Sequence, residues 1–197
     1  MSAGGVRFPP GVRLEPSEPC VRCSSDHQDY NEGQSQIGGR LDIIVTPVGW
    51  VRSPEKGKRE DYWGEVVSEI VLDSGRFSPA ALEGLAEFSH IEVLFHLDRV
   101  QVSQVETGRR HPRGHVGWPE VGIFAQRAKS RPNRIAASIC RVLSVQGLTI
   151  TVQGLDALDG SPVLDIKPVM AEFLPDRKQI RQPEWACQLM KEYFSSR

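Results

Sequence analysis

Two charged segments of this chain flank one predicted β-hairpin, and their residue types suit ligand binding. The first, residues 122–138, carries the basic residues Arg127, Lys129, Arg131 and Arg134, and the second, residues 156–168, carries Asp156, Asp159 and Asp165. Either segment alone would equally suit a solvated turn. Arginines bind carboxylates through paired N–H groups, and aspartates attract cations. Together the segments predict a site for a ligand with both a carboxylate and a positive charge, such as S-adenosylmethionine.

A third charged cluster lies within a long polar connection between residues 99 and 120. It contains Arg109, Arg110 and Arg113. Connections longer than about 12 to 15 residues within a compact domain are usually functional or disordered. We therefore favour contacts with nucleic-acid phosphates over a merely solvated loop.

The histidines and cysteines supply no obvious catalytic group. His90 and His96 alternate with the apolar residues of a predicted strand, which predicts buried, hydrogen-bonded side chains rather than catalytic ones. Cys20, Cys23 and His27 have metal-like spacing, but a structural zinc site needs four ligands and the sequence offers no fourth nearby. We therefore predict no metal site.

The elements that would position these residues are mainly β-strands. Short apolar or alternating runs predict strands at residues 43–51, 66–72, 90–97, 121–126, 138–145, 148–155 and 163–166. Gly147 lies at the turn between the fifth and sixth of these, where glycine tolerates a positive φ. Six or seven strands separated by turn signals favour a single antiparallel β-barrel with short helices.

Two helices are predicted between and after the strands. Ser78 followed by Pro79 is typical of a helix start. Near the C-terminus, Trp185, Leu189 and Tyr193 recur at four-residue spacing. Such a stripe predicts a helix that docks on the domain or on a partner subunit.

Length and composition fit one domain with appendages. The chain has 197 residues and a formal net charge of -1, so any RNA contact would depend on a local basic patch. We expect a flexible tail over residues 1–40, a β-barrel domain over 41–175 and a helical extension over 176–197. The sequence lacks a membrane-spanning apolar run and the apolar core of a signal peptide, which predicts a cytoplasmic protein without membrane contact.

Five segments occur in a familiar order: residues 48–54, 82–90, 122–125, 131–133 and 155–168. They resemble the TsaA-like (TrmO/YaeB) family of S-adenosylmethionine-dependent tRNA methyltransferases over roughly residues 43–174. The resemblance is specific because five ordered motifs must coincide. It implies a β-barrel that acts as a homodimer, binds S-adenosylmethionine outside the Rossmann pattern, and methylates N6 of threonylcarbamoyladenosine beside the anticodon of tRNA.

The resemblance also implies which positions contact the cofactor. The family's Arg-Pro-Asn core is retained at residues 131–133, whereas the flanking residues differ, which leaves the acceptor substrate less defined than the cofactor. By position, the implied cofactor contacts fall on Arg59, Glu60, Asp61, Asp98, Arg99, Arg127, Ala137, Asp156, Ala157, Leu158 and Asp159.

A mechanistic hypothesis follows from these positions. Arg127 would hold the methionine carboxylate or a neighbouring group of the cofactor, and Asp156 or Asp159 would face its positive end or its ribose. Asp165 and Lys167 are the candidate catalytic residues on the acceptor side, where alignment and a proton acceptor are needed. The residues expected to contact tRNA phosphates are Arg109, Arg110, Arg113 and Arg131. Two alternatives remain: a non-catalytic barrel that binds a nucleotide or S-adenosylmethionine, and a methyltransferase with a different acceptor.

Overall fold

The structure, a computed structural model, describes residues 36–37, 40–41, 43–57 and 59–196. Its contacts divide the chain into two units at residues 44 and 45. In the first unit, β1 (Gln36–Ile37) pairs with β2 (Arg40–Leu41) in antiparallel fashion. The candidate zinc ligands Cys20, Cys23 and His27 lie outside the described residues, as does most of the expected tail. Everything below concerns the second unit.

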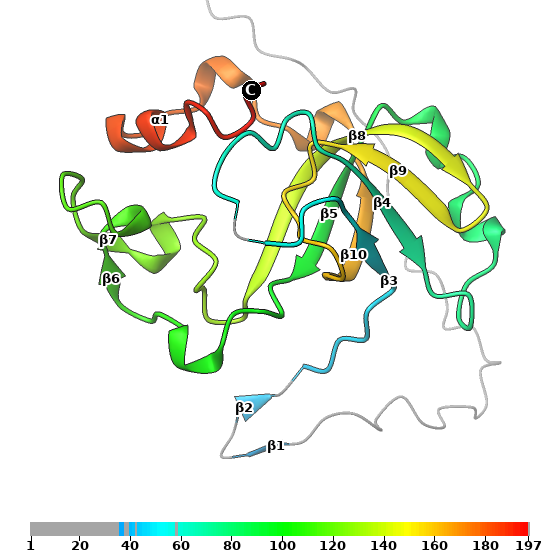
Figure 1. Ribbon diagram of the computed structural model, residues 1–197, viewed down its shortest axis with the longest axis horizontal. Coiled ribbons are helices and arrows are strands. Elements are labelled where there is room, and N and C mark those ends of the chain that lie inside the picture. The colour runs from blue at the N-terminus through cyan, green and yellow to red at the C-terminus, as the bar shows by residue number, and fades with distance from the viewer. Residues whose placement is uncertain (1–35, 38–39, 42, 58, 197) are drawn as a thin grey trace, which may run out of the picture. The chain divides into compact units, whose positions relative to one another are not determined.

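Six strands of this unit close into an antiparallel barrel (Figure 1). The strand order is β10-β3-β4-β9-β8-β5, with β10 pairing to β5 to close the ring. The predicted fold class is therefore confirmed. The six strands are β3 (Gly49–Arg52), β4 (Val67–Leu72), β5 (His90–His96), β8 (Ile135–Gln146), β9 (Thr149–Gln153) and β10 (Pro162–Pro168).

The core fills the barrel with the inward-facing residues of each strand. On β5 the alternation is complete, since Ile91, Val93 and Phe95 are buried while the residues between them face outward. The loop between β9 and β10 adds Leu155 and Ala157 to the same cluster. This loop, residues 154–161, is thereby anchored by its own apolar side chains, which gives its aspartates a fixed position.

The outward face of β5 corrects one sequence expectation. His90 is exposed, and its Nδ1 lies 2.9 Å from the Ser89 hydroxyl, while His96 is half-buried. The strand alternation was predicted correctly, but the outer face of a barrel strand lies towards solvent unless another element covers it. The prediction that both histidines are buried was therefore wrong.

A polar lobe, residues 98–134, leaves the barrel after β5 and returns at β8. It contains η3 (Val102–Gln104), η4 (Pro112–Gly114), η5 (Ile123–Ala125) and a two-stranded sheet of β6 (Arg109–Arg110) and β7 (Val121–Gly122). The buried amide of Gln126 donates to carbonyls of Arg110 and Val121 and so ties the lobe together. The predicted strand over residues 121–126 is thus two residues of strand followed by a 3-10 turn.

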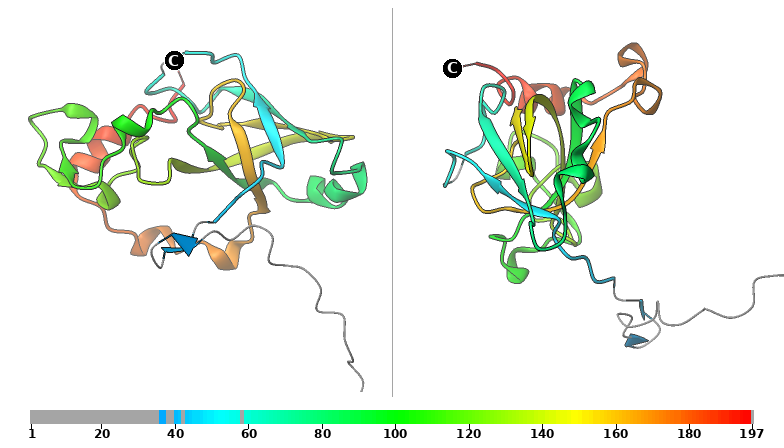
Figure 2. Two further views of the ribbon diagram at one scale, coloured as in Figure 1. Left: turned by 90° about the horizontal axis from the view of Figure 1, so that it is seen from below. Right: turned by 90° about the vertical axis from the view of Figure 1, so that its right-hand side faces the viewer.

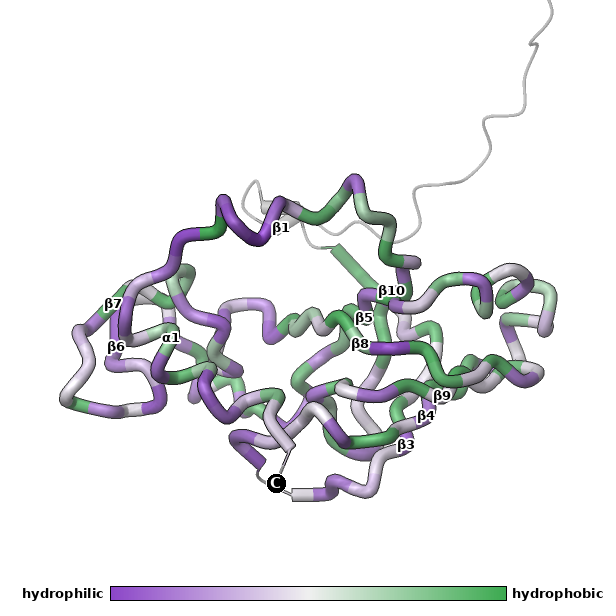
Figure 3. Tube along the Cα trace, turned by 90° about the horizontal axis from the view of Figure 1, so that it is seen from above, coloured by the Kyte–Doolittle hydropathy of each residue, from purple (hydrophilic) through white to green (hydrophobic). Residues whose placement is uncertain are grey.

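The remaining helical elements are short. The helix predicted at Ser78 and Pro79 is the 3-10 turn η1 (Pro79–Leu82), followed by η2 (Leu85–Glu87). The predicted strand over residues 43–51 proved too long at its start, because β3 begins at Gly49. After β10 come η6 (Ala171–Phe173) and η7 (Arg177–Gln179), in an arc that Figure 3 shows as largely hydrophobic next to β10 and mainly hydrophilic towards α1.

The C-terminal segment, residues 184–196, lies against both the lobe and the barrel domain (Figures 1 and 2). Its helix α1 (Glu184–Met190) contacts the lobe through Gln188, whose side-chain oxygen accepts from the Trp118 indole at 2.8 Å. Beyond the helix, the backbone N–H groups of Tyr62 and Trp63 donate to carbonyls of residues 192 and 193 at 3.0 and 2.8 Å. This segment is therefore hydrogen-bonded both to the lobe and to the loop before β4.

Candidate functional site

The Asp156 carboxylate is the centre of the candidate site. Asp156 lies in the anchored loop 154–161, and both of its oxygens accept hydrogen bonds from distant parts of the chain. One oxygen accepts from the Ser138 hydroxyl on β8, and the other accepts from the Tyr193 hydroxyl of the C-terminal segment at 2.6 Å. Each carboxylate oxygen has a second lone pair, so Asp156 retains acceptor capacity for a ligand.

The charge of Asp156 acts on its neighbours through a poorly solvated environment. Burial, reinforced by this charge, raises the pKa of Tyr193, while the cations Arg113 and Arg127 oppose the shift. Burial and the same carboxylate raise the pKa of Cys140 from 9.0 to about 12. The Asp156 carboxylate therefore lies close enough to both groups to add to the effect of their burial.

Arg127 converges on the same place from the lobe. Its guanidinium donates to the Ala137 carbonyl of β8, and Ala137 directly precedes Ser138, the residue that holds Asp156. The Arg127 side chain is otherwise exposed, so the rest of its donor fork is available to a ligand. The structure thus brings together the basic and acidic segments that the sequence predicted to meet.

Arg113 and Asp61 form a clamp, which we call the Arg113–Asp61 pair, beside Tyr193. The guanidinium donates to both Asp61 oxygens at 2.8 and 2.7 Å and to the Glu60 carbonyl at 2.9 Å. The hydrogen bond to Asp61 raises the pKa of Arg113. Its guanidinium carbon also lies 5.9 Å from the centre of the Tyr193 ring. The pair therefore fixes the lobe and the 60–62 loop around the tyrosine.

Arg59, a predicted cofactor contact, is instead engaged by its own loop. Its side chain is 13% exposed and pairs with Glu55. It also donates to the carbonyls of Asp61 and Tyr62, and it lies 5.4 Å from the centre of the Trp63 ring. With its donors occupied, Arg59 shapes the loop that carries Asp61, and a direct contact with a ligand has little geometric support.

Asp159 belongs to a second group, away from Asp156. Its carboxylate accepts from the Ser53 backbone N–H at 3.0 Å, and Arg99 donates to the carbonyls of Asp159 and Lys56 at 2.6 and 2.5 Å. The neighbouring Asp98 is exposed. The predicted cofactor positions therefore fall into two sets, one around Asp156 and one around Asp159.

The two residues between these aspartates do not offer polar side chains. Ala157 is buried in the core and Leu158 is half-buried. On the Asp159 side the surface has an open depression of about 440 Å³, lined by Arg52, Ser53, Lys56, Val67, Ser68, Glu69, Thr151 and Asp159.

The arginines predicted to contact RNA differ in whether their guanidinium groups already have partners within the chain. Arg110 donates to the Ser130 hydroxyl at 2.8 Å. Arg131 donates to backbone carbonyls within residues 123–126, and Arg113 is held by Asp61. Arg109 is 76% exposed and lies 3.8 Å from a Glu120 oxygen, so its charge is accessible. For phosphate contact the geometry favours Arg109, whereas the other three mainly build the lobe.

Asp165 and Lys167 face outward on β10 and pair with each other at 2.5 Å. The hydrogen bond and charge of Asp165 raise the pKa of Lys167, so this lysine stays protonated and is a poor proton acceptor. Asp165 pairs in register with Leu94, and Leu94 pairs with Ala137. The carboxylate therefore lies two strands from the carbonyl that accepts from Arg127.

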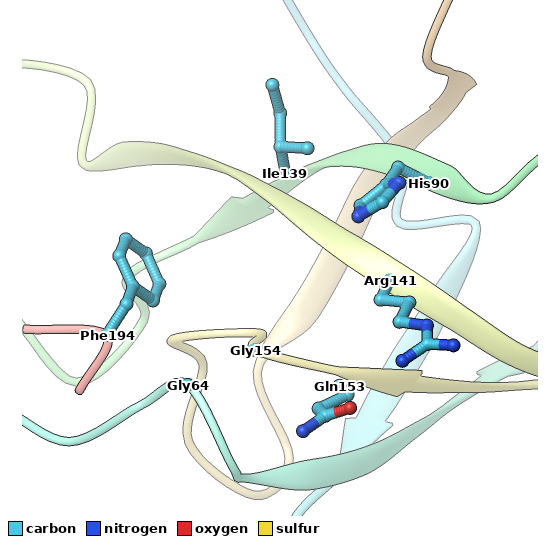
Figure 4. Close-up of a pocket in the computed structure, with 7 residues that line it drawn as sticks. All are labelled: Gly64, His90, Ile139, Arg141, Gln153, Gly154 and Phe194. Carbon is cyan, nitrogen blue, oxygen red and sulfur yellow. The ribbon is translucent and has the colours of Figure 1, made fainter. Parts of the chain in front are cut away.

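A second depression, about 310 Å³, opens on the outer surface where β8 and β9 meet the C-terminal segment. We call it the β8 depression. Figure 4 shows its residues, with His90 and Arg141 facing each other across neighbouring strands and Phe194 at the opposite end. It is lined by Gly64, His90, Ile139, Arg141, Gln153, Gly154 and Phe194.

Sequence reasoning missed Ser138 and Tyr193 as parts of the site. Tyr193 was recognised as a member of an apolar helical stripe, but a tyrosine carries a polar tip that usually finds a partner when it is buried. Nothing in its spacing connects it to Asp156, 37 positions earlier. Ser138 ends the first charged segment, and its inward position on β8 follows only once the strand register is known.

Comparison with known proteins defines the class. The family profile described as the tRNA-methyltransferase O N-terminal domain matches residues 53–174. The chain therefore belongs to this family. The matched region contains Asp61, Arg113, Arg127, Ser138 and Asp156, whereas Tyr193 lies beyond it.

Individual relatives agree with this assignment. A probable S-adenosyl-L-methionine-binding protein of Methanothermobacter thermautotrophicus is 38% identical over 135 residues, which cover 65% of this chain and 90% of the relative. The mouse tRNA (adenine(37)-N6)-methyltransferase is 34% identical over 93 residues, 47% of this chain and 21% of that protein. The crystal structure of TrmO from Pseudomonas aeruginosa matches with a TM-score of 0.60 at 27% identity, covering 74% of this chain and 62% of that one. The present chain thus spans less than two thirds of that solved chain.

Within the described residues, no helix is long and apolar enough to cross a membrane. In the same part of the chain, no group of three or more His, Cys, Asp or Glu side chains is arranged to hold a metal ion.

Proposed function

We propose that this protein is an S-adenosylmethionine-dependent methyltransferase that modifies N6 of threonylcarbamoyladenosine beside the anticodon of tRNA. Its membership of the tRNA-methyltransferase O family supports the reaction class. Relatives whose names specify S-adenosylmethionine binding and adenine-37 N6 methylation support the cofactor and the acceptor.

The observation that carries the proposal is the convergence of Arg127 and Asp156 on the adjacent residues Ala137 and Ser138. S-adenosylmethionine carries a carboxylate together with a cationic ammonium and a cationic sulfonium, so a site with one basic and one acidic side chain complements its charges. Arg127 retains free donors and Asp156 retains acceptor capacity, so this donor set fits the cofactor. The two groups come from the lobe and the barrel, and their spacing is maintained by Ser138 and Tyr193.

When bound, the cofactor supplies an electrophilic methyl group. The chain aligns the acceptor nitrogen with that group and provides an acceptor for the N6 proton. We assign Arg127 to the methionine carboxylate and Asp156 to the sulfonium or the ribose. The acceptor nitrogen is conjugated to the ring and the carbonyl, so holding it in line with the methyl group contributes much of the acceleration. We assign removal of the N6 proton to the Asp165 carboxylate. Protonated Lys167 would orient that carboxylate, since its Nζ lies 2.5 Å from an Asp165 oxygen.

We further propose that the enzyme acts as a homodimer in the cytoplasm and that Arg109 contacts a tRNA phosphate. The exposed Arg109 side chain supports the latter. Arg109→Gln should weaken tRNA binding broadly and reduce its salt dependence by about one unit of slope. Light scattering of the purified chain measures its subunit number, and a monomer at enzyme-assay concentrations would remove the dimer from the proposal.

The decisive experiment incubates the protein with methyl-labelled S-adenosylmethionine and tRNA that either carries or lacks the threonylcarbamoyl mark. We expect label to enter the marked tRNA alone, at the modified adenosine. Binding of S-adenosylmethionine without transfer would instead indicate the non-catalytic barrel. Equal labelling of both tRNAs would indicate a methyltransferase with a different acceptor.

A further inference from the structure

Three residues that line the β8 depression lie one or two positions along the chain from residues of the Asp156 site. Ile139 follows Ser138, which holds Asp156, and Gly154 lies two positions before Asp156. Phe194 follows Tyr193, the other residue bonded to Asp156. Because Ser138 points inward and Ile139 outward, the depression lies on the outer face of β8. On that face Ile139 pairs with Glu92, and Glu92 pairs with Lys167 beside Asp165, so the depression shares the outer face of the sheet with the candidate catalytic pair.

The aromatic end of the depression is held firmly. A Cβ atom at Gly64 would lie 2.0 Å from the Phe194 carbonyl oxygen, so only glycine allows the C-terminal backbone to lie this close. The Phe194 ring meets the Tyr193 ring edge to face, with 4.9 Å between their centres. Phe194 is nevertheless 48% exposed. A fixed and half-exposed aromatic ring is a suitable surface for a nucleic-acid base, because such rings stack on unpaired bases.

The rest of the lining complements a base that carries an anionic group. Ile139, 45% exposed, adds apolar surface. Among the described residues, none makes a hydrogen bond or ion pair with the side chains of Arg141 and Gln153, and both are accessible. An amide can bond to a base edge, and a free guanidinium binds a carboxylate through two N–H groups.

We propose that the β8 depression receives the acceptor nucleotide, with the base against Phe194 and Ile139 and the threonyl carboxylate on Arg141. This assignment rests on the proposed function and names the substrate pocket of the same site. Threonylcarbamoyladenosine joins a purine to a carboxylate, which matches the two ends of the depression. The depression is open and has a volume of about 310 Å³, so it offers a surface against which the nucleotide could lie.

Transfer kinetics with marked tRNA at saturating S-adenosylmethionine test the pocket. Arg141→Gln and Phe194→Ala should each lower kcat/KM by at least about tenfold, mainly by raising KM for tRNA, while S-adenosylmethionine affinity stays within about twofold of wild type. Arg177→Gln and Phe173→Ala are matched controls, since both residues are exposed and lie outside the depression. Wild-type kinetics in both pocket variants would overturn the assignment.

Nucleoside binding separates this proposal from the proposed function. Calorimetric titrations use threonylcarbamoyladenosine, adenosine and adenosine 5'-monophosphate as ligands, with thermal unfolding of each variant as a check of its fold. We expect the modified nucleoside to bind at least about tenfold more tightly than adenosine, and Arg141→Gln to remove that preference. Tighter binding of the monophosphate than of the modified nucleoside would mean that Arg141 binds a phosphate, and the carboxylate assignment would fall. If the preference is present but methyl transfer is absent, the pocket stands and the proposed function fails.

Discussion

Asp156 and Asp159 lie in the same anchored loop, but the chain holds them in different ways. Asp156 accepts from two side-chain hydroxyls that belong to β8 and to the C-terminal segment. Asp159 accepts from the backbone N–H of Ser53, and its own backbone accepts from Arg99. Backbone partners shape the loop, whereas side-chain partners from distant segments adjust the position and charge of a functional group.

The surroundings of the two carboxylates differ in the same sense. Asp156 helps to raise the pKa of both Tyr193 and Cys140. Arg127 donates to the carbonyl of Ala137, the residue before Ser138, which in turn donates to Asp156. Asp159 borders an open depression that it shares with Lys56 and Arg52. We infer that Asp156 serves the reaction and Asp159 serves the loop, although their sequence contexts look alike.

Replacing each aspartate by asparagine is the most direct way to break this comparison. Asp156→Asn should lower kcat/KM for methyl transfer by two to three orders of magnitude, because a preorganised charge at a reacting centre typically contributes that much. Asp159→Asn should change it by less than about threefold, since the asparagine oxygen can still accept from Ser53. Steady-state rates and S-adenosylmethionine affinities of the two variants measure the contrast. Equal losses would show that both carboxylates bind the ligand.

Asp156 and Asp159 also show which features of the site could be predicted from the sequence. The strands that contain the core were predictable, because alternation on β5 and the glycine turn at Gly147, with φ of 59°, depend on local residues. The meeting of Arg127 with Asp156 also followed, since both flank the β8–β9 hairpin. The division between Asp156 and Asp159 did not, because it depends on Tyr193 and Ser53 arriving from remote segments.

Errors in the predicted elements have similar physical causes. The residues at 121–126 have strand-like types, yet the lobe offers only a two-residue partner at β6, and a strand needs a partner to extend. Arg113 has a positive φ of 51° and turns back onto Asp61. One arginine of the basic cluster therefore forms an ion pair within the chain, whereas Arg109 of the same cluster stays exposed.

The pH dependence of stability at alkaline pH tests the burial of the groups around Asp156. The pKa of Cys140 is raised from 9.0 to about 12 in the folded protein, so its contribution to stability is complete below pH 9 and is lost as pH rises towards 12. We expect a loss of roughly 2 to 3 kcal/mol by pH 11, at about 1.4 kcal/mol per pH unit. The raised pKa of Tyr193 adds a loss of the same sign above about pH 10.

Denaturant unfolding from pH 8 to pH 11 measures this dependence. In Cys140→Ala the thiol contribution should vanish, so the slope against pH should be shallower whatever the stability at pH 8. In Asp156→Asn the slope should also become shallower, since the carboxylate charge helps to raise both pKa values. Asp159→Asn is the control and should retain the wild-type slope. A wild-type slope in Asp156→Asn would show that the Asp156 carboxylate does not influence these two pKa values.

The Arg113–Asp61 pair should contribute moderately to stability. Its side chains are 26% and 23% exposed, so the pair is neither fully exposed nor fully buried. Exposed ion pairs contribute up to about 1 kcal/mol to stability, and disrupting a buried pair costs about 3 to 5 kcal/mol. We expect Arg113→Gln to lower the free energy of unfolding by about 2 kcal/mol at neutral pH. A double-mutant cycle with Asp61→Asn isolates the pairing energy from other losses. Additive losses would show that the pair is not coupled.

Tyr193→Phe is expected to have the smallest effect on stability and the most selective effect on function. It removes a 2.6 Å hydrogen bond to Asp156 but keeps the ring that packs beside Arg113 and Phe194. The free energy of unfolding should fall by about 1 kcal/mol. Because Asp156 then has a single side-chain partner, kcat should fall about three- to tenfold, with thermal unfolding still cooperative.

Position 62 provides a matched control for this last change. Tyr62 also donates its hydroxyl across to the C-terminal segment, but its acceptor is Glu192 rather than Asp156. Tyr62→Phe should therefore cost similar stability without the loss of kcat. If the two phenylalanine variants lose kcat equally, the C-terminal segment acts only by holding the fold together. If only Tyr193→Phe loses kcat, the orientation of the Asp156 carboxylate is what the segment contributes to the reaction.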